Sequence, residues 1–157
     1  RPSRFVRTYE TESLAIDVGM EGFLDFHIGN SEWLEAEWEH YTDFPDDPRY
    51  TELAQSIVET LPENYRENKI AQAFAIKLFL DKQTQYTMSE RHNRAKDPTA
   101  EFLFGPYKQF IGYCVHTSHA AVFLWRAMGI PARIGIGYAT PAEQRRGAAV
   151  PCTKHCY

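Results

Sequence analysis

The most apolar helix that the sequence predicts begins near Cys114, and it constrains the fold more than any other feature. Residues 120–125 read Ala-Ala-Val-Phe-Leu-Trp, so a helix over this stretch has no polar side and should be buried nearly all round. Gly129-Ile130-Pro131 ends the helix, because glycine suits the position after a helix and proline cannot continue one. Residues 132–138 then alternate between large apolar and other side chains, which predicts a strand.

Size and composition allow such a core. The chain has 157 residues, of which 43% are hydrophobic and 24% charged, the balance of one globular domain rather than of a disordered chain. Its net charge of −4 argues against a nucleic-acid binder, which normally shows a basic face. No apolar run approaches the roughly 20 residues of a membrane span. The three cysteines cannot form a disulfide framework, because pairing leaves one over.

Further elements are predicted between the N-terminal region and this helix. One helix starts near Pro48, where Asp46 or Asp47 can cap it, and Pro62 ends it. The remaining predictions are, in chain order, a helix over about 67–82, a short strand at 85–88, a surface loop over 89–97 and a capped helical turn over 97–105 that stops at glycine.

Residues 1–44 are predicted to be a β-rich lead-in, or the end of a preceding domain, before a core domain at 45–157. Three short, partly alternating runs predict strands at 5–9, 14–18 and 23–28. The aromatic residues of 31–47 suggest a connector pinned by its rings, and a carbohydrate-binding strip is the alternative.

Cys114 is the best candidate for chemistry. It follows Gly112-Tyr113 at the start of the apolar helix. The N–H groups and positive dipole end of a helix N-terminus favour a thiolate, which is the nucleophilic form, and can hold a developing oxyanion. Gly112 would let a substrate backbone approach closely. The alternative is a buried cysteine that packs as a small apolar residue.

Other polar residues give weaker signals. His116 and His119 lack a third metal ligand at convincing spacing, so we interpret them as structural histidines that form hydrogen bonds. Residues 152–156 hold two cysteines and a histidine, but a zinc site needs one more ligand nearby, and an unstructured end is preferred. Arg126 and Arg133 flank the turn after the helix; for Arg133 a structural ion pair is the default, with substrate binding as the alternative.

Residues 97–138 resemble the transglutaminase-like superfamily of papain-fold cysteine enzymes. The family pattern has a glycine–aromatic–cysteine opening, a helix of small residues, then Arg-Ala-x-Gly-Ile-Pro-Ala-Arg and Gly-Tyr. The matching residues here are 97–104, Gly112-Tyr113-Cys114-Val115-His116, Ala120-Ala121, 124–133 and Gly137-Tyr138. Upstream, residues 46–50, 71–80 and 86–87 look like the lead-in helices of bacterial members, so the resemblance covers about residues 45–138.

The resemblance implies an α+β papain-like fold in which N-terminal helices and the helix of the nucleophile pack on an antiparallel sheet. It also implies a Cys–His–Asp triad with Cys114 as the nucleophile, and neither a metal nor a cofactor. In such a triad the histidine takes the thiol proton and the carboxylate orients the histidine. A thioester then forms and is split by an amine or by water.

One departure from the family pattern concerns the triad histidine, which the family places on a strand written His-small-Trp-x-Glu. His155 follows Cys114 by 41 residues, but Cys156-Tyr157 comes next, and no aspartate follows Cys114. The chain also starts with Arg1 rather than Met and stops without a closing element. We therefore expect a C-terminally truncated piece of a longer protein, inactive by itself, with the triad histidine and aspartate beyond its end and His155 as the alternative.

Functions from two different classes follow from this resemblance. The first is a bacterial transglutaminase-like acyltransferase or cysteine peptidase, a hydrolase that acts on protein or peptide amide bonds. The alternative is a catalytically inactive copy of the fold that binds peptides or serves as a scaffold. The expected partner is a protein or peptide substrate, with no nucleic acid and no membrane contact from this segment. The resemblance further implies an extracytoplasmic location, periplasmic or at the cell surface, in a parent anchored by membrane spans elsewhere.

Overall fold

The computed structural model describes residues 19–89, 92, 94–107, 109–139 and 153–156. Its elements are, in chain order, η1 (Met20–Phe23), α1 (Glu35–Thr42), α2 (Pro48–Glu59), η2 (Glu63–Tyr65), α3 (Lys69–Gln83), β1 (Gln85–Tyr86), α4 (Pro98–Phe104), β2 (Ile111–Gly112), α5 (Cys114–Ala127), β3 (Ile136–Ala139) and β4 (Thr153–Cys156). None of the helices in these ranges is both long and apolar enough to cross a membrane.

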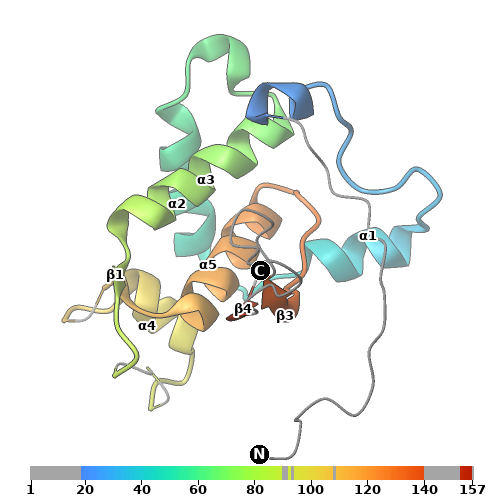
Figure 1. Ribbon diagram of the computed structural model, residues 1–157. Coiled ribbons are helices and arrows are strands. Elements are labelled where there is room, and N and C mark those ends of the chain that lie inside the picture. The colour runs from blue at the N-terminus through green and yellow to red at the C-terminus, as the bar shows by residue number, and fades with distance from the viewer. Residues whose placement is uncertain (1–18, 90–91, 93, 108, 140–152, 157) are drawn as a thin grey trace, which may run out of the picture.

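Helix α5 lies at the centre of the molecule, with α2, α3 and α4 packed around it (Figure 1). No residue from Cys114 to Met128 is exposed, but only His116, Ala120, Val122 and Leu124 are fully buried, so the predicted burial of this helix holds in part. The shared core draws on all four helices through Tyr50, Ala54, Ile57, Ile76, Leu80, Ala100, Phe102, Leu103, Ala120 and Leu124. Truncating a buried leucine of this kind typically costs about 2–5 kcal/mol, so this contact layer dominates the stability of the domain.

The helix ends follow from local sequence signals. Asp47, Asn68 and Asp97 cap α2, α3 and α4 through side-chain oxygens that accept main-chain N–H groups. Gly129 adopts a left-handed φ of 70° after α5. The N–H of Gly129 donates to the carbonyl of Arg126, and the next N–H donates to the carbonyl of Trp125, which is the Schellman arrangement. The predicted helix starts and stops of this region are confirmed.

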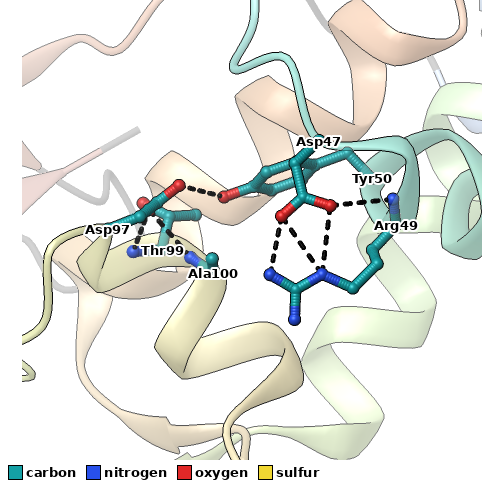
Figure 2. A network of polar contacts seen from close by, with 6 residues as sticks. All are labelled: Asp47, Arg49, Tyr50, Asp97, Thr99 and Ala100. Carbon is teal, nitrogen blue, oxygen red and sulfur yellow. Dashed lines mark hydrogen bonds and ion pairs between the residues drawn. The ribbon is translucent and has the colours of Figure 1, made fainter.

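A buried tyrosine joins α2 to α4. The side chain of Tyr50 is fully buried, and its hydroxyl donates to a carboxylate oxygen of Asp97 at 3.2 Å (Figure 2). Burial, with a smaller effect of Asp97, raises the pKa of Tyr50, so the hydroxyl keeps the proton that it donates. The other oxygen of Asp97 accepts the N–H groups of Thr99 and Ala100, both at 2.9 Å. One carboxylate therefore caps α4 and fixes α4 to α2.

The strands form two separate pairs among the described residues. β1 and β2 run parallel, with Gln85 opposite Ile111, whereas β3 and β4 run antiparallel, with Gly137 opposite His155. A mixture of five helices with little strand agrees with the α+β class that the sequence predicts. The larger antiparallel sheet stays a prediction, because only the β3–β4 pair has that arrangement in the described part of the chain.

The prediction of a strand at 23–28 is wrong. Phe23 ends the 3₁₀ helix η1, and its ring packs on Phe26, with ring centroids 5.7 Å apart. In a strand, residues three apart face opposite sides, whereas in a helical turn they share a side. The ring of Phe74 in α3 lies 6.4 Å from Phe23, and Asn68 donates to the carbonyl of Leu24, so the turn docks on α3. The strands predicted at 5–9 and 14–18 lie outside the described residues.

The aromatic connector contains a helix that the sequence analysis missed. Helix α1 has no buried residue and no apolar stripe, so its sequence carries no pattern that predicts a helix. Trp33 lies just before α1, where its ring stacks on Tyr41 at 4.9 Å and meets Trp38 edge-on at 5.5 Å. These rings contact one another, as expected for a connector that is held in place by its aromatic residues.

Two further expectations need correction. The strand predicted at 132–138 starts only at Ile136, because the main chain at Ala132 donates to Tyr41 and not to a neighbouring strand. Arg133 is exposed and makes no ion pair with any described residue, so the ion pair expected for it is not found there. The polar stretch 89–97 is not wholly at the surface, because the side chain of His92 is buried.

We predict that Asp97→Ala destabilises the domain by about 1–3 kcal/mol, because it removes the cap of α4 and leaves the hydroxyl of buried Tyr50 without its acceptor. Asp97→Asn keeps a cap oxygen and a polar group toward Tyr50, so it should cost less than half as much. Urea unfolding of both variants provides the measurement. Equal losses in the two variants would contradict the assignment of Asp97 to capping.

A second prediction concerns acid stability. The hydrogen-bonded guanidinium of Arg49 holds the pKa of Asp47 below its usual range. The folded state therefore binds this proton less readily than the unfolded state, and the pair stabilises the fold above about pH 4. That stabilisation is lost as the pH falls through the lowered pKa. The stability difference between the wild type and Asp47→Asn, measured by urea unfolding, should narrow from pH 6 to pH 2; a constant difference would contradict the proposed pair.

Candidate active site

Cys114 is the first residue of α5, directly after strand β2 and the N-cap residue Tyr113. Tyr113 has extended backbone angles (φ −136°, ψ −176°), so the chain turns from strand to helix at this point. The side chain of Cys114 is partly exposed. The predicted position of Cys114 at the start of the helix is confirmed.

Cys114 lines a surface pocket of about 470 Å³. Three elements line this pocket: the C-terminal end of α3, strand β1 and the first turns of α5. Its lining residues are Asp81, Thr84, Tyr86, Cys114, Thr117 and Ser118. Cys114 therefore lies at a surface pocket, and the orientation of its sulfur toward that pocket stays a prediction.

The pocket wall combines charged, hydroxyl and aromatic groups. Asp81 forms an ion pair with Lys77 one helical turn earlier, and both side chains are about half exposed. The hydroxyl oxygen of Thr84 is buried and has no hydrogen-bond partner among the described residues. Tyr86 is 67% exposed, and its hydroxyl lies 3.6 Å from the sulfur of Met88. The pocket wall thus presents an exposed aromatic ring as well as polar groups.

The first turn of α5 leaves main-chain donors near the cysteine. The carbonyl of Tyr113 accepts the N–H groups of His116 and Thr117 at 2.9 and 3.2 Å. No described residue accepts from the N–H groups of Cys114 and Val115, as is usual for the first residues of a helix. Such donors stabilise negative charge that develops on an oxygen atom.

His116 and His119 both bond to the main chain at the start of α5, His116 to the N-cap residue and His119 to the first turn. The Nδ1 of His116 accepts the N–H of Tyr113 at 3.2 Å, and the Nδ1 of His119 donates to the carbonyl of Val115 at 2.8 Å. These bonds are what the interpretation as structural histidines predicts. Within the described ranges, no three or more His, Cys, Asp or Glu side chains gather in a way that could hold a metal ion.

His92 is a polar residue of this region that sequence reasoning missed. Its ring is buried, and its Nε2 lies 2.7 Å from the carbonyl oxygen of Ile111 in β2. The ring centroids of His92 and His116 are 5.0 Å apart. The sequence offered no signal for this contact, because His92 sits in a polar stretch without periodicity and its partners lie about twenty residues away.

Arg126, near the C-terminal end of α5, is not among the residues that line the pocket. Arg126 donates to the carbonyl of Ala132 from Nε at 3.0 Å and to the carbonyl of Asp43 at 2.7 Å, so it ties the end of α5 to the end of α1. His155 belongs to β4, where its main chain lies opposite Gly137 of β3. Strand β4 also contacts α5. Cys152 lies outside the described residues, so the zinc alternative for residues 152–156 is untested.

Comparison with known proteins assigns the fold to a family. A search of curated proteins and a search of solved structures each return no match. A family model for the transglutaminase-like superfamily matches residues 51–157, from the first turns of α2 to the last residue of the chain. The match includes Cys114, its pocket and all of α5. The chain therefore belongs to the transglutaminase-like superfamily.

Proposed function

We propose that Cys114 is the nucleophile of an enzyme that acts on amide bonds of proteins or peptides. The observation that carries this proposal is the place of Cys114, which is the first residue of α5 and lines a surface pocket. A cysteine kept only for packing needs no such access to solvent. The family to which the chain belongs is one of papain-like cysteine enzymes, and this membership supports the same role.

In the proposed reaction, the sulfur attacks the carbonyl carbon of the amide, and the thiol proton passes to a histidine base. The tetrahedral oxyanion lies near the N–H groups of Cys114 and Val115, which have no acceptor among the described residues. Collapse of this intermediate breaks the C–N bond, and the amine leaves with the proton from the histidine. The resulting thioester is then split by an amine, which gives acyl transfer, or by water, which gives hydrolysis.

Two histidines are candidates for the base of this reaction. Neither His116 nor His119 is among the residues that line the pocket beside Cys114, which favours a base from another element. Strand β4 carries His155 and contacts α5, so His155 is one candidate. A histidine beyond Tyr157 remains the other, because His155 lacks the neighbours of the family pattern. No aspartate follows Cys114 in this sequence, so we expect the 157 residues alone to turn over slowly or not at all.

We predict that iodoacetamide modifies Cys114 in the folded protein. Cys152→Ser and Cys156→Ser in the same chain leave Cys114 as its one thiol. Mass spectrometry should then show one added carbamidomethyl group, and Cys114→Ala in that background should show none. A cysteine that reacts only in urea would contradict the pocket position and, with it, the proposed nucleophile.

A second prediction tests the activity itself. The assays are incorporation of a primary amine into a glutamine-bearing protein and hydrolysis of peptide amides. They are run on the 157 residues and on a version that extends past Tyr157. The extended version should be active and Cys114→Ala should abolish its activity, whereas the short chain should be at least about 100-fold slower, which is the usual contribution of general-base catalysis.

Comparable activity of the short chain, lost in His155→Ala, would instead identify His155 as the base. If the extended version shows no activity in either assay while iodoacetamide still modifies Cys114, the proposal of an enzyme would be contradicted. That result would favour a binding module that keeps the fold.

A further inference from the structure

A buried histidine holds the main chain just before Cys114. His116 is the third residue of α5 and is 6% exposed. Its Nδ1 accepts the N–H of Tyr113, the residue that precedes the helix, at 3.2 Å. An imidazole nitrogen accepts only when it carries no proton, so in this contact the ring is bonded through an unprotonated Nδ1. Glutamate or glutamine usually makes this bond from the third position of a helix.

Packing fixes the ring of His116 in that orientation. The ring stacks on Phe102 of α4 at 5.8 Å with an interplanar angle of 21°, and it meets Tyr113 edge-on at 4.6 Å. A Cβ atom added at Gly112 would lie 2.7 Å from the Nδ1 of His116, so strand β2 lies directly against the ring. The absence of a side chain at Gly112 is therefore what allows this contact.

His92 also bonds to strand β2. A carbonyl oxygen can only accept, so the Nε2 of His92 donates to the carbonyl of Ile111 at 2.7 Å. The two rings touch edge-to-face at 5.0 Å. His92 has a left-handed φ of 50°, a strained conformation for a residue other than glycine, which the surrounding contacts must maintain. Two imidazoles thus hold the residues from Ile111 to Tyr113.

We propose that His116, supported by His92, is a positioning residue that sets the start of α5 and thereby keeps the sulfur of Cys114 in its pocket. The proposal rests on the proposed function of Cys114, because positioning matters only if the sulfur reacts. The acceptor on His116 fixes the N–H of Tyr113, and the angles of Tyr113 determine where Cys114 begins the helix. Without that acceptor the first turn of α5 frays, and the position of Cys114 at its start is no longer fixed.

The test uses variants that distinguish the hydrogen-bond acceptor of His116 from the packing of its ring. His116→Phe keeps an aromatic ring against Phe102 but has no acceptor, whereas His116→Gln restores an acceptor without the ring. His119→Phe is the matched control, because His119 also bonds to the main chain of α5 but does not bond to Tyr113. All variants carry Cys152→Ser and Cys156→Ser. The readout is the second-order rate of iodoacetamide modification of Cys114, with urea unfolding to measure stability.

We expect modification of Cys114 to slow about three-fold or more in His116→Phe, within the effect that a helix N-terminus exerts on a nearby charge. The rate should return to within about two-fold of the wild type in His116→Gln, and it should stay there in His119→Phe. A rate that follows the unfolding free energy alone, or a failure of glutamine to restore it, would overturn the positioning role. If Cys114 does not react in any folded variant, the proposed nucleophile fails, and the positioning role fails with it.

A measurement on the wild-type chain tests the same inference without any substitution, so it remains valid if a variant does not fold. Amide hydrogen exchange followed by NMR should show the N–H of Tyr113 protected relative to the N–H groups of Cys114 and Val115, because only Tyr113 has the imidazole acceptor. Exchange of Tyr113 as fast as its two neighbours would overturn the inference.

Discussion

Helix α5 is held by contacts with α2, α3 and α4, and these contacts place the other features of the domain. Leu124 of α5, Leu80 of α3 and Phe102 of α4 are almost fully buried in one cluster. Interiors of this kind are close-packed, so a shift of α5 along its axis would displace many contacts at once. The packing of the core therefore also fixes the position of Cys114 at the N-terminal end of α5.

The N-terminal end of α5 differs from the rest of the helix because strands β1 and β2 lie beside it in addition to α3 and α4. Strand β2 enters directly before Cys114, and the β1–β2 pair brings Tyr86 beside Gly112. The pocket forms where the end of α3, strand β1 and α5 meet. Buried histidines hold β2 and the start of α5, while Cys114 stays partly exposed. A rigid core thus supports an accessible cysteine, an arrangement that suits a nucleophile that must remain fixed during a reaction.

Local rules account for the elements that were predicted from the sequence. The caps at Asp47 and Asp97, the glycine after α5 and the start of the helix at Cys114 each depend on residues within one turn of one another. The errors come from segments where local patterns and tertiary contacts disagree. Residues 23–28 alternate like a strand, but they dock on α3 as a turn. Helix α1 has no apolar stripe, and its aromatic contacts arise partly from Trp33, which lies outside the helix.

The sequence by itself determined the family pattern, the central helix and the candidate nucleophile, because a uniformly apolar helix with a cysteine at its start is encoded in consecutive residues. Only the tertiary structure decided what surrounds that cysteine. Asp81 and Tyr86 reach the pocket from elements about thirty residues before Cys114, and His92 reaches β2 from a polar stretch. These contacts depend on how α3, α4 and α5 pack, and no pattern within a short window of sequence reports the relative placement of packed helices.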